Sequence, residues 1–178
     1  MLKRTYLKTS VGTIIGRFQV PELHEAHTEL IQSVCNEHSK VILILGVSPL
    51  LGSTNNPLDF ESRKQMILEK FPTVTVLYIK DTKYDSIWSQ RLDALIEDVI
   101  TPTQTVTLYG SRDSFISRYS GKFATAELEA KNYVSGTEIR KSIKDKVLPS
   151  YDFRAGVIWA SFNKFVQTFS TVDVAIFN

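Results

Sequence analysis

Two histidines three residues apart, His24 and His27, follow shortly after Gly16 and Arg17 at the start of a predicted helix. The first turn of a helix carries unpaired backbone N–H groups and the positive end of the helix dipole, which together favour phosphate. Imidazoles add hydrogen-bond donors that can follow the charge on a phosphate as it shifts during a reaction. A guanidinium binds phosphate oxygens with a permanent positive charge. The stretch is a candidate phosphate site. A buried histidine or a metal pair is the alternative, although no third ligand follows at a metal-type spacing.

Apolar periodicity predicts the elements that position this stretch. An apolar run precedes it and apolar residues at helical spacing follow it, which indicates a strand, a loop and a helix. Continuous apolar runs are typical of parallel strands covered on both faces. The predicted strands cover residues 11–15, 41–46, 74–79, 105–110 and 123–128, with helices from about 27, 60 and 88. This alternation predicts an α/β fold with a parallel sheet of about five strands, helices on both faces and ligands at the carboxyl ends.

A second strand-to-helix corner lies near residue 135. Ser135 and Thr137 are suitable N-cap residues, and Arg140 follows one turn later. Backbone N–H groups and a guanidinium are therefore available for phosphate at this corner as well. Taken alone, the pattern equally fits an ordinary capped helix with a surface arginine.

The composition limits the class of protein. The chain has 178 residues, 43% hydrophobic and 22% charged, which fits one soluble globular domain spanning residues 1–178. A net charge of +2 does not suggest nucleic acid as a partner, and no segment is suited to crossing a membrane. The single cysteine, Cys35, fits a reducing compartment, so we expect a cytoplasmic protein.

The two corners resemble a known family. The run Gly16-Arg17-Phe18-Gln19, then Pro21 and His24-x-x-His27, resembles the HxGH signature of nucleotidyltransferases, which have a Rossmann-like fold. It is most similar to nicotinamide mononucleotide (NMN) adenylyltransferases, including those fused to a Nudix hydrolase. The run 134–140 resembles the second superfamily signature, Ile-Ser-x-Thr-x-x-Arg. Two departures are a longer loop before His24 and Ala26 in place of the usual glycine.

The resemblance implies transfer of AMP from ATP to NMN, forming NAD and pyrophosphate. It implies that His24 and His27 bind the α- and β-phosphates, that Arg17 and Arg140 hold the β- and γ-phosphates, and that Mg²⁺ accompanies ATP without a protein cage. The residues implied in ATP binding are Gly16, Phe18, Gln19, Gly110, Ser111, Asp113, Ser135, Gly136 and Thr137.

The resemblance also implies an acceptor site for NMN. It would comprise Asn56, Arg63, Tyr84, Asp85 and Trp88, with Arg63 on the substrate phosphate and Trp88 stacked on the nicotinamide. From the residues alone, a solvated surface charge is the favoured interpretation of Arg63, and a core position is the simplest interpretation of Trp88. Asp85 stands where asparagine is common in this family, and a carboxylate accepts but does not donate hydrogen bonds. That substitution bears on the choice between NMN and nicotinic acid mononucleotide.

Residues 151–178 resemble the connection to a Nudix domain, with a helix from 152 and a strand at 171–176. The Nudix box is absent from the sequence, so we expect no Nudix activity. Two other functions remain open: a nucleotidyltransferase with a different phosphate acceptor, and a catalytically silent nucleotide sensor. The oligomeric state is also open, a homo-oligomer included.

Overall fold

One parallel sheet organises the chain. The computed structural model describes residues 10–50, 52–111, 114–128 and 135–163. Within them, five strands lie in the order β3-β2-β1-β4-β5, and every neighbouring pair is parallel. The strands are β1 (Ser10–Gly16), β2 (Lys40–Val47), β3 (Thr75–Lys80), β4 (Thr105–Gly110) and β5 (Ala124–Glu127). The predicted α/β fold is confirmed, whereas the strand predicted at 171–176 lies outside the described residues.

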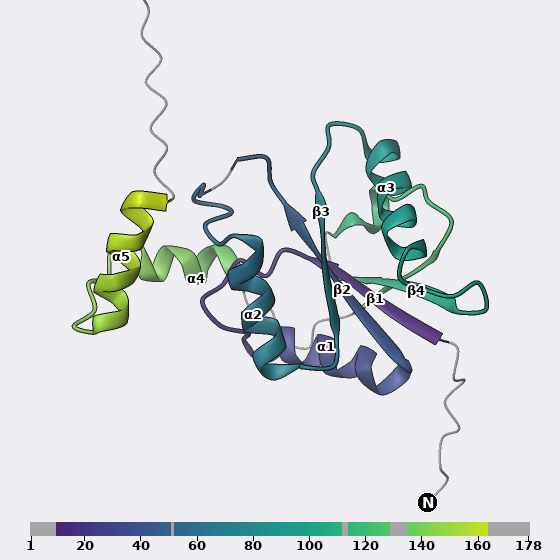
Figure 1. Ribbon diagram of the computed structural model, residues 1–178, viewed down its shortest axis with the longest axis horizontal. Coiled ribbons are helices and arrows are strands. Elements are labelled where there is room, and N and C mark those ends of the chain that lie inside the picture. The colour runs from purple at the N-terminus through teal and green to yellow at the C-terminus, as the bar shows by residue number, and fades with distance from the viewer. Residues whose placement is uncertain (1–9, 51, 112–113, 129–134, 164–178) are drawn as a thin grey trace, which may run out of the picture.

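Helices cover both faces of the sheet, as predicted (Figure 1). The helices are α1 (Glu25–Glu37), α2 (Phe60–Lys70), α3 (Asp85–Glu97), α4 (Gly136–Ile143) and α5 (Tyr151–Asn163), with a 3₁₀ turn η1 (Phe115–Arg118). Alternation along β2 explains the layers, because successive side chains of a strand point to opposite faces. Leu43 and Leu45 pack on the face that α1 and α2 cover, and Ile42 and Ile44 on the face that α3 covers.

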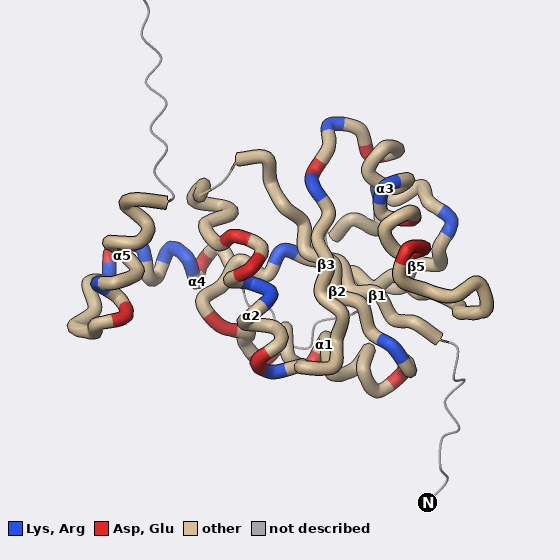
Figure 2. Tube along the Cα trace, viewed as in Figure 1, with Lys and Arg blue, Asp and Glu red and all other residues tan. Residues whose placement is uncertain are grey.

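The connections place a crevice at the carboxyl ends of β1 and β4. From β1 the chain proceeds to β2 on one side, and it later returns to β4 on the other. Ligands of open parallel sheets bind at such a switch point. Figure 2 shows charged residues on the helices and loops, with the central strands largely uncharged.

The last two described helices extend away from the sheet (Figure 1). The described residues of α4 and α5 include none that is buried. The helix predicted from residue 152 is observed as α5. Among the helices of the described ranges, none has the length and apolar character that a membrane span requires.

Candidate active site

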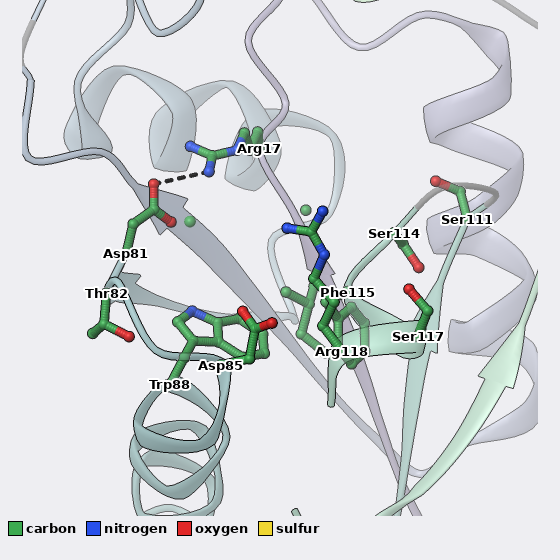
Figure 3. A pocket seen from close by; sticks show the side chains of 13 residues that line it. Arg17, Asp81, Thr82, Asp85, Trp88, Ser111, Ser114, Phe115, Ser117 and Arg118 are labelled. Carbon is green, nitrogen blue, oxygen red and sulfur yellow. Dashed lines mark hydrogen bonds and ion pairs between the residues drawn. The ribbon is translucent and has the colours of Figure 1, made fainter. Parts of the chain in front are cut away.

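A cavity of about 700 Å³ opens at the carboxyl ends of the strands (Figure 3). It contains residues predicted for both substrates: Gly16, Arg17, Asp85, Trp88 and Ser111. The remaining lining residues are Ile15, Gly46, Asp81, Thr82, Ser114, Phe115, Ser117 and Arg118. The sheet thus brings together side chains from loops that are far apart in the sequence.

Arg17 lies at the edge of this cavity and is held at both ends of its guanidinium. Its Nη1 donates to Asn56 Oδ1 at 3.0 Å, and its Nη2 pairs with Asp81 Oδ2 at 2.8 Å. Asp81 follows β3 directly, and its backbone N–H donates to Val47 O. The sequence analysis missed Asp81. Its signal was an acidic residue immediately after a buried strand, where ligand-site residues gather.

The histidine pair forms the N-terminus of α1. His24 Nδ1 accepts from the backbone N–H of His27 at 3.4 Å, and the two rings stack with centroids 3.7 Å apart. His24 Nε2 and His27 Nδ1 are buried and have no hydrogen-bond partner among the described residues. Burial lowers the pKa of His24, and burial together with the charge of His24 lowers the pKa of His27 to about 4. Both rings are therefore neutral near pH 7, each with one unsatisfied ring nitrogen.

Phe18 supports this pair from the loop between β1 and α1. It is buried, has a φ of 48°, and lies with its ring centroid 4.7 Å from that of His27. A Cβ on Gly16 would lie 2.7 Å from the Phe18 ring, so the close approach requires glycine at position 16. The observed contacts of Phe18 are those of packing, and its predicted contact with ATP stays a prediction.

The second corner meets the first through Arg140. Ser135 caps α4 as predicted, since its hydroxyl accepts from Glu138 N. Arg140 Nη1 donates to Gln19 O at 3.0 Å, and its Nη2 donates to Thr137 Oγ1 at 3.0 Å. Gly136 is also close, because a Cβ there would lie 3.4 Å from Val20. The two corners, 121 residues apart in sequence, are thus in direct contact.

Two predicted ligand residues have different partners in the structure. Arg63 is 1% exposed, and its guanidinium donates to Asp59 O, Arg17 O and Gly46 O at 2.7–3.0 Å. Gln19 is 5% exposed, and its amide exchanges two hydrogen bonds with the backbone of Leu58. Both side chains tie loops together, so Arg63 is not the solvated surface charge that was its alternative. The predicted contacts of Arg63 with NMN and of Gln19 with ATP stay predictions. Sequence spacing did not show which polar groups the fold would bury.

Several of the remaining predicted residues do not line the cavity. The cavity lining does not include His24, His27 or Arg140, which lie beside the loop that borders it. Tyr84 is 58% exposed and precedes α3 without lining the cavity. Gly110 ends β4, where a Cβ would overlap the Ser114 hydroxyl. Asp113 lies outside the described residues.

A search of the described residues finds no group of three or more His, Cys, Asp or Glu side chains suited to a metal ion. The expectation that Mg²⁺ accompanies ATP on its phosphate oxygens stays a prediction.

Replacing Arg63 with alanine is expected to destabilise the fold by about 3 kcal/mol or more, because three carbonyl oxygens lose a charged donor and a buried volume empties. Urea unfolding checks this, with Gln65→Ala on the exposed side of α2 as the control. Unchanged stability together with a raised KM for the acceptor would instead make Arg63 a substrate ligand.

Acidification is expected to lower the free energy of unfolding. The unfolded chain protonates His27 near pH 6.5, whereas the folded chain does so only near pH 4, so the unfolded state binds more protons between these values. The loss from this side chain is about 2 kcal/mol between pH 7.5 and pH 5. Urea unfolding at the two pH values measures it, and His27→Asn should lose less stability than the parent. An equal loss in both proteins would contradict the burial of His27.

Comparison with known proteins places the chain beside one kind of enzyme. No protein-family model matches it. A nicotinamide/nicotinic acid mononucleotide adenylyltransferase of Acinetobacter baylyi is 27% identical over 169 residues, which cover 90% of this chain and 86% of that protein.

Solved structures share the fold. A bifunctional NMN adenylyltransferase/ADP ribose pyrophosphatase from Francisella tularensis aligns with a TM-score of 0.66 at 21% identity, over 87% of this chain and 51% of that one. A second structure of a bifunctional enzyme of that name and organism contains AMP and a manganese ion. It aligns with a TM-score of 0.66 at 19% identity, over 87% of this chain and 50% of that one. A NadR protein in complex with NAD and AMP-PNP aligns with a TM-score of 0.57 at 20% identity, over 75% of this chain and 42% of that one.

The chain therefore spans about half the length of the bifunctional structures it matches. At these identities the structures show a common fold. The chain has the Rossmann-like fold of nucleotidyltransferases, and in sequence it resembles NMN adenylyltransferases, as its two motifs predicted.

Proposed function

We propose that the chain transfers AMP from ATP to nicotinamide mononucleotide, giving NAD and pyrophosphate. The contact between the two corners is the observation that carries this proposal. Because Arg140 Nη1 donates to Gln19 O, the start of α4 lies against the loop that leads into the histidine pair. Two helix N-termini, two imidazoles and two guanidinium groups are therefore available to one triphosphate.

The reaction is a displacement at the α-phosphorus. A phosphate oxygen of the mononucleotide forms a bond to the α-phosphorus of ATP, and the bond to the bridging oxygen breaks as pyrophosphate leaves. Such a transfer depends mainly on positioning and charge stabilisation. In this proposal His24 and His27 contact the α- and β-phosphates, where the unsatisfied nitrogens His24 Nε2 and His27 Nδ1 supply partners. Negative charge beside the rings would also favour their protonated forms.

Arg17 and Arg140 complete the phosphate contacts in this proposal. Asp81 and Asn56 fix the direction of the Arg17 guanidinium, and Thr137 and the Gln19 carbonyl fix that of Arg140. Fixed donors lose little freedom when the charged transition state forms. Mg²⁺ enters as part of the substrate Mg–ATP.

The cavity provides the acceptor site. Trp88 lines it with a flat aromatic face, and Phe115 packs against Trp88 with ring centroids 5.8 Å apart. Aromatic faces attract cationic rings, and the nicotinamide ring of NMN is cationic. The Acinetobacter relative carries the names of both the amide and the acid mononucleotide, so its name supports this class of acceptor.

A pyrophosphate-release assay tests the reaction. With Mg–ATP and NMN, the purified chain is expected to release one pyrophosphate for each NAD formed. Pantetheine phosphate in place of the mononucleotide separates the alternative acceptor, and tight ATP binding without turnover would identify the silent sensor. Absence of pyrophosphate release with either mononucleotide would refute the proposal.

His27→Ala is expected to lower kcat by about 10²-fold or more, because it removes a contact that strengthens as charge develops in the transition state. Steady-state kinetics measure the effect, and circular dichroism checks that the variant folds. Gln32→Ala, on the exposed face of the same helix, serves as the control. A kcat close to that of the parent would remove His27 from the mechanism.

A further inference from the structure

The described lining of the cavity contains one unpaired charge of each sign. Among the residues that the structure describes, four charged side chains line the cavity: Arg17, Asp81, Asp85 and Arg118. Arg17 and Asp81 neutralise each other through their ion pair. The side chains of Asp85 and Arg118 have no hydrogen-bond or ion-pair partner in the part of the chain that the structure describes. Within the described lining, the charges left for a ligand are therefore one carboxylate and one guanidinium.

The carboxylate lies on the aromatic side of the cavity. Asp85 begins α3 and stands three residues before Trp88, so the two side chains share one face of the helix. Both line the cavity, and Figure 3 shows them projecting from the start of that helix. A cation stacked on the Trp88 ring would consequently lie near a negative charge.

The guanidinium comes from a different segment of the chain. Arg118 is the last residue of η1, whose first residue, Phe115, packs on Trp88. In Figure 3 its guanidinium extends into the cavity on the side of Arg17. The hydroxyls of Ser114 and Ser117 line the same cavity. A free guanidinium with neighbouring hydroxyl groups is suited to phosphate oxygens.

We infer that Asp85 and Arg118 select the amide mononucleotide by matching its two charges. This inference rests on the proposed function. NMN carries a positive pyridinium ring and a negative phosphate. Asp85 faces the ring, and Arg118 binds the phosphate, whereas the guanidinium of Arg63 is buried against backbone carbonyl oxygens. Nicotinic acid mononucleotide carries a ring carboxylate in place of the amide, and Asp85 repels this carboxylate. Asp85 is therefore the specificity-determining residue between the two.

The two residues have different expected effects, because the phosphate is common to both acceptors and the ring carboxylate is not. Asp85→Asn is expected to raise the ratio of kcat/KM for the acid over the amide by about tenfold or more. Arg118→Gln is expected to lower kcat/KM for both acceptors by about tenfold and to leave their ratio unchanged. The parent chain is expected to prefer NMN.

Kinetics at saturating Mg–ATP with each mononucleotide measure these ratios. Two variants outside the cavity lining, Asp98→Asn and Arg91→Gln, make the same charge changes on or beside α3 and should leave the ratio as in the parent. An unchanged ratio in Asp85→Asn would overturn the inference. A loss confined to the acid in Arg118→Gln would also overturn it, since Arg118 would then bind the ring carboxylate.

A binding measurement separates this inference from the proposed function. The chain has two tryptophans, so Trp159→Phe leaves Trp88 as the only fluorescent indole. Quenching of Trp88 by each mononucleotide gives dissociation constants without turnover. Tighter binding of NMN that depends on Asp85, in a chain that releases no pyrophosphate, would refute the reaction and support the selection. Turnover together with equal binding of both mononucleotides would support the reaction and refute the selection. Binding of neither mononucleotide would refute the reaction and the selection alike.

Discussion

The buried guanidinium of Arg63 is the interaction on which the site depends. It donates to the carbonyl oxygens of Arg17, Gly46 and Asp59, which belong to three separate segments at the carboxyl ends of the strands. Burial and the charge of Arg17 lower the pKa of Arg63, while Asp59 and Asp81 oppose that shift. A charge so deeply buried is tolerable only because carbonyl oxygens surround it. The same contacts fix where the loop after β1 leaves the sheet.

That loop is then held from both sides, which explains the position of the histidine pair. Gln19 exchanges two hydrogen bonds with the backbone of Leu58 on one side, and Arg140 holds the Gln19 carbonyl on the other. Phe18 packs beneath His27 in a left-handed backbone conformation that this bracing stabilises. Preorganisation of this kind lowers the cost of ordering the site when a nucleotide binds. The loop before His24, longer than is usual in the family, is therefore well supported.

Periodicity and short motifs were sufficient to predict the sheet, its covering helices and the two corners. Each of these features is local in sequence, so a window of a few residues carries the signal. The distant partners of Arg63 and Gln19 were not predictable in this way. Two of the three carbonyl oxygens that Arg63 contacts lie 17 and 46 residues away, and the backbone that Gln19 contacts lies 39 residues away. Arg118 was missed for a related reason, because its place in the cavity is set by strand order and not by its neighbours in the chain. Asp81 had a local signal in its position directly after a strand, but its partner Arg17 lies 64 residues away.

The histidine corner and the cavity differ in what they cost the stability of the folded chain. At the corner, burial keeps His24 and His27 neutral and leaves one nitrogen of each unsatisfied, a cost that the folded chain bears without ligand. A bound phosphate would remove this cost by supplying a partner and a negative charge at once. In the cavity, by contrast, Asp85 and Arg118 stay exposed to water and cost the fold little. Their interaction energy arises only when a ligand excludes that water. In the proposed mechanism, therefore, the histidine corner binds phosphate in general, whereas the cavity distinguishes one mononucleotide from another.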